Sequence, residues 1–153
     1  MTIRSAALAA GLVAGLAAAL AASTASAAGG IKGFWRTGDG RSVVEITDCT
    51  NGICGRVVSM PPDANVTDLN NPDASLHSRP LCKLVILHSF TQTSDTEWED
   101  GTIYDPKGGK TYDANMTLTG PDTIDLRGYV GISLFGRTDT WTRQQPGSFK
   151  PCG

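Results

Sequence analysis

The chain has 153 residues, of which 40% are hydrophobic and 18% charged, and its formal net charge is −2. This length suffices for a single domain with a sizeable core. Because the chain contains no run of Lys or Arg, the sequence argues against binding to nucleic acid and to anionic membrane surfaces.

The N-terminal residues predict an export signal. Met1–Arg4 carries one positive charge, Ser5–Ala22 is a run of small and apolar residues, and Ala25-Ser26-Ala27 fits the small-x-small cleavage rule. We therefore expect residues 1–27 to be a cleaved signal peptide and residues 28–153 to be one domain, periplasmic or secreted. The alternative is an uncleaved membrane anchor, which the weak hydrophobicity of this Ala-rich run disfavours. The absence of a Cys directly after the cut argues against a lipoprotein. The remaining domain has twelve basic and fifteen acidic residues, a formal charge of −3.

The domain is predicted to consist almost entirely of short strands. Apolar and polar residues alternate along 110–119 and 123–130, which is typical of strands with one buried face. Hairpin turns are expected at 100–101, 106–109 and 120–122. We expect strands at 33–37, 41–49, 53–60, 82–92, 95–99, 101–105, 110–119, 123–130 and 137–143.

So many strands in one small domain leave sheet edges that must be protected, and closing the sheet protects them most completely. The predicted fold is therefore all-β, a single up-and-down antiparallel barrel of about eight strands. A two-sheet sandwich is the alternative. The interior of an eight-stranded barrel is either filled by side chains or holds one small ligand.

The four cysteines all lie in the exported part, which favours disulfides. Asn51-Gly52 is a strong two-residue hairpin signal, and with these residues as the loop Cys49 and Cys54 become a directly opposed, non-hydrogen-bonded pair. Their Cα atoms would then lie about 4.5 Å apart, within disulfide range. Cys82 and Cys152 pair by elimination.

Trp35 and an Arg near the last strand are the candidates for closing one end of the barrel. Gly33-Phe34-Trp35 opens the domain as a G-x-W motif at the first strand. In the lipocalin-type arrangement the indole packs across the closed end and a guanidinium stacks over it. Arg143 is the first candidate for this guanidinium and Arg137 the second. The alternative is that Trp35 is an ordinary core residue.

The segment 61–80 is the one long irregular stretch and is rich in Pro, Asn, Asp and Ser. Loops of this length inside a compact domain usually have a function. Asp68, Asn71 and Arg79 are candidate lid residues that shape a pocket mouth. The alternative is a self-braced loop in which Arg79 pairs with Asp68.

The chain as a whole resembles a bacterial family of small exported proteins, known as a domain of unknown function, with a lipocalin-like barrel. The matching residues are Gly33-x-Trp35, Cys54-Gly55, Asp68-x-x-Asn71-Pro72, Arg79-Pro80-Leu81, Trp98, Gly101-x-Ile103-Tyr104-Asp105-Pro106, Gly109-Lys110-Thr111-Tyr112, Arg127-Gly128-Tyr129-Val130-Gly131, Gly136-Arg137 and Trp141-Thr142-Arg143. The resemblance implies the fold and a location in the cell envelope, and it supplies no catalytic residues.

We expect an exported protein that binds a small apolar or amphipathic molecule. The first alternative is a module with a filled core that contacts an envelope protein. The second is a hydrolytic enzyme, although no nucleophile–base pair and no metal-ligand spacing is recognisable. No catalytic residue, metal ligand, cofactor or stable membrane anchor is therefore assigned. A cavity inside the barrel would distinguish the first two expectations.

Overall fold

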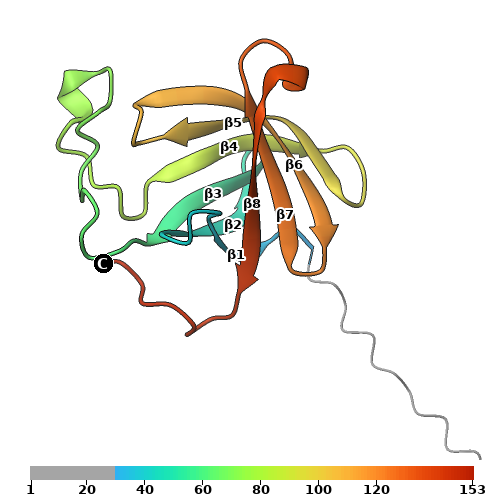
Figure 1. Cartoon of the computed structure of the whole chain (residues 1–153), viewed down its shortest axis with the longest axis horizontal. Helices are drawn as coiled ribbons and strands as arrows, with labels where there is room; N and C mark the ends of the chain where they lie inside the picture. The colour runs from blue at the N-terminus through green and yellow to red at the C-terminus, as the bar shows by residue number, and fades with distance from the viewer. Residues whose placement is uncertain (1–29) are drawn as a thin grey trace, which may run out of the picture.

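The computed structural model describes residues 30–153, so the predicted signal peptide lies outside the described residues. Eight antiparallel strands follow one another along the chain, and each pairs with its neighbours. They are β1 (Gly33–Arg36), β2 (Val43–Cys49), β3 (Gly52–Ser59), β4 (Val85–Gln92), β5 (Glu97–Asp105), β6 (Lys110–Gly120), β7 (Thr123–Tyr129) and β8 (Arg137–Gln144). β8 pairs back onto β1 and closes the sheet, so the predicted up-and-down barrel is confirmed (Figure 1).

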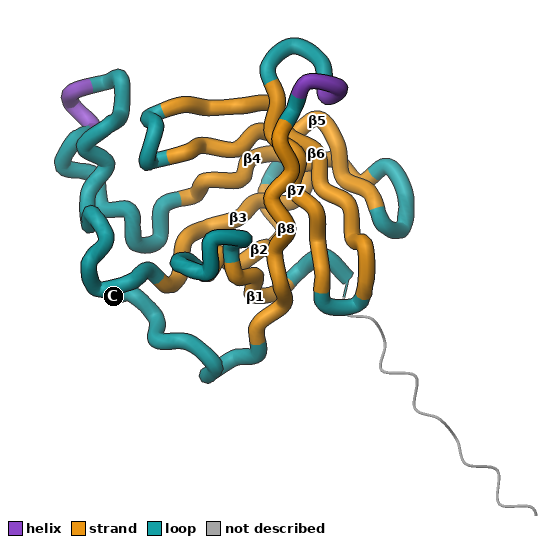
Figure 2. The backbone as a smooth tube through the Cα atoms, in the orientation of Figure 1, coloured by secondary structure: helices purple, strands orange, loops and turns teal. Residues whose placement is uncertain are grey.

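Short connections join most of the strands, and two contain a single 3₁₀ turn, at Ala74–Leu76 and Ser133–Phe135 (Figure 2). None of the helical segments in residues 30–153 has the length and apolar character needed to span a bilayer.

The predicted hairpin at Asp100-Gly101 is wrong, because β5 runs through these residues as one continuous strand. Asp100 has a φ of 56°, and the pairing with β6 shifts register between Trp98 and Gly101. The two residues therefore form a bulge. A Cβ on Gly101 would lie 2.3 Å from the Phe90 ring. The glycine makes room for this core ring, and the sequence signal that suggested a turn is explained by the bulge.

The β2–β3 hairpin differs by two residues from the expected register, because its turn lies one position earlier in the chain. Cys49 pairs with Gly52 and Cys54 with Thr47, so the two cysteines are not directly opposed. Gly52 has a φ of 106° and follows a two-residue turn at Thr50 and Asn51. The positive φ therefore falls on the first strand residue after the turn, as in a hairpin with a glycine bulge. The turn therefore lies at Thr50 and Asn51, one position before the Asn51-Gly52 turn that the sequence predicts.

The cysteines nevertheless lie in the two expected pairs. Cys49 and Cys54 form a disulfide with Cα atoms 5.8 Å apart, and Cys82 and Cys152 form one with Cα atoms 5.9 Å apart. The second bridge joins the C-terminal tail to the long β3–β4 loop. The backbone N–H of Cys152 also donates to the carbonyl oxygen of Val58 at 2.8 Å. The tail is therefore fixed along β3.

The barrel has two different ends. In an up-and-down barrel, alternate connections lie at the same end. One end, called here the mouth, is therefore surrounded by four connections, which are residues 37–42, 60–84, 106–109 and 130–136 (Figure 1). The shorter turns and the first described residues lie at the other, closed end. The closed half is packed with large buried side chains: Trp35, Val44, Ile46, Phe90, Met116 and Ile124. Any interior space must therefore open toward the mouth.

Candidate functional site

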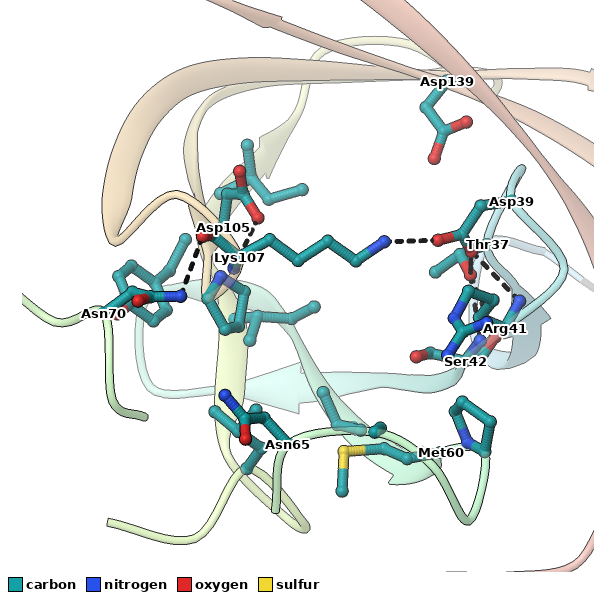
Figure 3. Close-up of a pocket in the computed structure, with 18 of the residues that line it drawn as sticks. Thr37, Asp39, Arg41, Ser42, Met60, Asn65, Asn70, Asp105, Lys107 and Asp139 are labelled. Atoms are coloured by element: carbon teal, nitrogen blue, oxygen red, sulfur yellow. Dashed lines mark hydrogen bonds and ion pairs between the residues drawn. The ribbon is translucent and has the colours of Figure 1, made fainter. Parts of the chain in front are cut away.

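A pocket of about 640 Å³ opens at the mouth of the barrel (Figure 3). Its walls are mainly apolar. They are formed by side chains of strands and of the β3–β4 loop, namely Val57, Leu81, Ile86, Ile103 and Trp141. The volume lies in the range of small-molecule sites. Apolar walls beneath an open mouth favour a ligand whose apolar part enters the barrel.

An ion pair spans this pocket. Lys107, in the turn between β5 and β6, extends toward the β1–β2 loop, and its Nζ lies 2.6 Å from Oδ2 of Asp39 (Figure 3). The hydroxyl of Thr37 and the backbone N–H of Arg41 donate to Oδ1 of Asp39 at 2.7 and 3.0 Å. Burial favours the neutral acid, but these hydrogen bonds and the Lys107 charge outweigh it and lower the pKa of Asp39 to about 2. Asp39 is therefore ionised at physiological pH.

A second ion pair joins the β1–β2 loop to the long β3–β4 loop. Nη2 of Arg41 lies 3.0 Å from Oδ2 of Asp63, and both residues line the pocket. Charged groups thus surround an apolar interior. A ligand with a polar end would find hydrogen-bond partners here while its apolar part is buried.

A second lobe of about 760 Å³ adjoins the first pocket. The two share Ile103, Asp105 and Asp139 as lining residues. Gly128 lines the second lobe, and a Cβ on it would meet Ile103 and Tyr112 at 3.6 and 3.7 Å, an ordinary contact distance. Glycine at this position leaves volume open that a larger residue would fill.

Asp139 places a carboxylate between the two lobes. Nε1 of Trp141 donates to its Oδ2 at 2.6 Å, and the backbone N–H of Gly38 donates to the same oxygen at 3.3 Å. The indole of the pocket wall is thereby oriented by its neighbour two residues along β8. This interaction also ties the β1–β2 loop to β8.

The three predicted lid residues meet in one buried cluster with Tyr104 of β5. Asp68 is fully buried. Its Oδ1 accepts from the Tyr104 hydroxyl at 2.5 Å, and its Oδ2 accepts from Nη2 of Arg79 at 2.5 Å and from Nδ2 of Asn71 at 2.9 Å. Arg79 also lies over the Tyr104 ring, 5.8 Å from its centroid. The cluster attaches the middle of the long loop to the outer surface of the barrel.

Competing effects determine which groups of this cluster are ionised. Burial alone would raise the pKa of Asp68, but hydrogen bonds from Tyr104, Arg79 and Asn71 and the Arg79 charge lower it overall. Burial and the hydrogen bond to Asp68 raise the pKa of Tyr104. The cluster is therefore a carboxylate held by a neutral phenol and a guanidinium. Within residues 30–153, Nε of Arg79 is the buried side-chain polar atom that has no hydrogen-bond partner.

The same loop borders the pocket. Nδ2 of Asn70 donates to the carbonyl oxygen of Lys107 at 3.0 Å, so the loop is bonded to the turn that carries the spanning lysine. The backbone of Asn70 also passes so close to Gly109 that a Cβ there would lie 1.8 Å from its carbonyl oxygen. Asp63, Thr67 and Leu81 of this loop line the pocket. The segment that the sequence marked as a lid thus forms one side of the mouth and is braced internally.

Trp35 and Arg143 lie at the closed end, away from the pocket. They are directly paired across β1 and β8, and Cζ of Arg143 lies 4.2 Å from the centre of the fully buried indole. The guanidinium also donates to the carbonyl oxygens of Gly30, Lys32 and Pro121. A Cβ on Gly33, whose φ is 128°, would lie 3.2 Å from Nη1 of Arg143, which accounts for glycine in the G-x-W motif.

Arg137, the second candidate, lies at the mouth end of β8, where it pairs with Gly128 and lines the second lobe. Arg143 is therefore the residue that the structure brings to Trp35.

Sequence reasoning missed the spanning pair Asp39–Lys107 and the contribution of Tyr104. Asp39 and Lys107 are 68 positions apart, and only the barrel closure brings them together. The sequence places Tyr104 in the expected strand 101–105, next to the hairpin turn at 106–109, and gives it no role in a site. The available signal was its place in β5, one residue from the inward-facing Ile103, which puts the phenol on the outer face beneath the loop. The part of the chain described contains no group of three His, Cys, Asp or Glu residues placed to hold a metal ion.

Comparison with known proteins agrees with this architecture. Residues 33–143 match the model of a protein family described as "Uncharacterized protein conserved in bacteria (DUF2147)". Among solved structures the chain is similar to protein HP1028 from Helicobacter pylori, described as belonging to the lipocalin family. The two share 20% identity with a TM-score of 0.67, over 74% of this chain and 82% of that one. This likeness concerns the fold. No curated protein matches the chain.

Proposed function

The chain belongs to the bacterial family DUF2147, and we propose that it is an exported protein that binds a small apolar or amphipathic molecule in the mouth of its barrel. The observation that carries the proposal is the pocket itself, about 640 Å³ with apolar walls and a charged rim. The filled closed half sets the depth to which a ligand can enter. Two disulfides are in keeping with an oxidising compartment outside the cytoplasm.

Each part of the pocket has a separate role in the proposed binding. The indole of Trp141 and the side chains of Ile86 and Ile103 cover the apolar part of the ligand, where area removed from water supplies most of the affinity. The polar end stays near Asp39, Lys107 and the carboxylate of Asp139. These charged groups orient the ligand, because its polar end can form hydrogen bonds with them and its apolar end cannot.

The experiment is a titration of the purified domain with cis-parinaric acid, a fluorescent fatty acid. We expect saturable one-to-one binding, and native mass spectrometry of the freshly purified protein should detect any ligand retained from the cell. Gly128→Leu should reduce probe affinity by about tenfold or more, because its side chain enters the open lobe without backbone strain.

Gly120→Leu is the matched control. It makes the same substitution at the closed end of the barrel, where a Cβ has its nearest neighbour at 3.8 Å. This variant should bind the probe as the wild type does. Equal binding by both variants would place the probe outside the barrel, and absence of binding by the wild type would refute the proposal.

A further inference from the structure

The exposed large hydrophobic side chains gather at one end of the molecule. In the described part of the chain all of them lie at or beside the mouth. Six belong to two loops, Val66, Leu69, Val130, Ile132, Leu134 and Phe135, with 51–79% of each exposed. The seventh, Val85, is 37% exposed at the mouth end of β4. Single exposed apolar residues are common, but this confinement to one rim indicates an interaction surface.

The two loops lie on different sides of the opening. One connects β3 to β4 and the other connects β7 to β8, so in the ring of eight strands they face each other across the mouth (Figures 1 and 2). A partner that contacts both must therefore extend across the pocket entrance. Val130 and Phe135 also line the second lobe, so the apolar rim continues into the barrel.

Both loops are held in the conformations that expose these residues. Arg127 donates from Nε to the carbonyl oxygen of Ser133 at 2.6 Å and from Nη2 to that of Leu134 at 3.1 Å. The other loop is fixed by the buried Asp68 cluster. The apolar side chains are thus presented on braced supports, which lowers the entropic cost of docking.

The charges of the molecule are distributed asymmetrically. The mouth segments 37–42, 60–84, 106–109 and 130–136 contain four basic and four acidic residues. The other described residues contain eight basic and eleven acidic residues, a net charge of −3. A bilayer that contains anionic lipid therefore repels the closed end and leaves the neutral, apolar mouth as the side that approaches it.

We propose that the mouth rim docks reversibly on a lipid bilayer, with the two apolar loops entering the interfacial region and the pocket opening toward the lipid. A bilayer is a broad apolar surface that reaches both loops at once, and the segment 130–136 contains no charged side chain that would have to leave water. The exchange of an amphipathic ligand between bilayer and pocket rests on the proposed function. The docking itself does not.

The test is flotation of the purified domain with vesicles of phosphatidylethanolamine and phosphatidylglycerol in a 3:1 ratio. The variant is Ile132→Ser/Leu134→Ser. Both residues are more than half exposed and line neither lobe, so folding and probe binding should be unchanged. Vesicle affinity should fall about tenfold or more, because the variant replaces two large apolar side chains that would be removed from water in the bilayer.

The control is Thr91→Ser/Thr119→Ser, which introduces serine at two exposed positions in the closed half of the barrel. It should float as the wild type does. Wild-type protein that binds cis-parinaric acid but does not float would overturn docking and leave the proposed function standing. Flotation without probe binding would do the reverse.

Equal flotation of the loop variant and the wild type would also overturn the proposal. If sedimentation instead shows a wild-type dimer that Ile132→Ser/Leu134→Ser abolishes, and no vesicle binding, the rim is a contact between copies of this chain.

Discussion

Tyr104→Phe tests whether the buried cluster holds the long loop on the barrel. The substitution removes one hydroxyl and leaves the ring, so packing against Arg79 is retained. Oδ1 of the fully buried Asp68 loses the hydrogen bond that it accepts at 2.5 Å. A hydrogen bond to a charged group contributes about 1.5–3 kcal/mol, so we expect the free energy of unfolding to fall by about 2 kcal/mol.

The assay is urea unfolding followed by tryptophan fluorescence at pH 7. With a slope of roughly 2 kcal/mol/M, a loss of about 2 kcal/mol lowers the midpoint by about 1 M. Tyr129→Phe is the matched control, because its hydroxyl makes a long hydrogen bond to Asn115, at 3.4 Å, on a partly buried part of the sheet. It should cost about 0.5 kcal/mol or less.

The effect should also depend on pH. The pKa of Asp68 is lowered in the folded protein, so its contribution is complete above the unfolded value of about 3.9 and is lost as the pH falls through the folded pKa. The difference between wild type and Tyr104→Phe should therefore shrink below about pH 4. Equal midpoints for the two Phe variants, or a difference that does not depend on pH, would refute the role given to the Asp68 charge.

Three further predictions concern the two ends of the barrel and the cysteines. Arg143→Ala should cost about 1–2 kcal/mol and Trp35→Ala about 3–5 kcal/mol of unfolding free energy, with the double variant losing less than their sum; strict additivity would contradict the stacking contact. Lys107→Met should leave stability within about 1 kcal/mol but raise the association and dissociation rates of the probe, because it breaks the pair with Asp39 across the pocket. Arg56→Met, which breaks an ion pair on the outer surface, is the control, and equal rates in the two variants would show that the spanning pair does not limit access. Thiol titration of the unfolded, unreduced protein should find no free thiol, and any titratable thiol would contradict the pairing.

The fold could be predicted because its signals are local. Alternation along β6 and β7 and the turn residues at 106–109 and 120–122 each depend on a few neighbouring positions. The failures at Asp100-Gly101 and Asn51-Gly52 have a common cause. A positive φ suits a bulge as well as a turn, and the choice depends on tertiary contacts such as that of Phe90 with Gly101.

The candidate site was predictable only in part. Asp68, Asn71 and Arg79 share one loop, so their polar residue types suggested mutual bonding. The pocket was not predictable, because residues as distant in the sequence as Val57 and Trp141 form its walls. The tilt of the strands also determines how much space remains between these side chains. The exposed apolar residues of 130–135 also escaped notice, since exposure is a property of the folded loop.

The pairing of β1 with β8 affects how the chain folds. Neighbouring strands can pair after closing short turns, whereas Trp35 and Arg143 are separated by 108 positions and meet only when all the intervening strands are in place. We therefore expect the seam between the first and last strands to form late, and until it closes both strands have unpaired edges that other chains can contact. β1 has only four residues, so its own unpaired edge is short. The Trp35–Arg143 stack lies on this seam, so we expect it to favour closure within one molecule over pairing of the free edges with other chains.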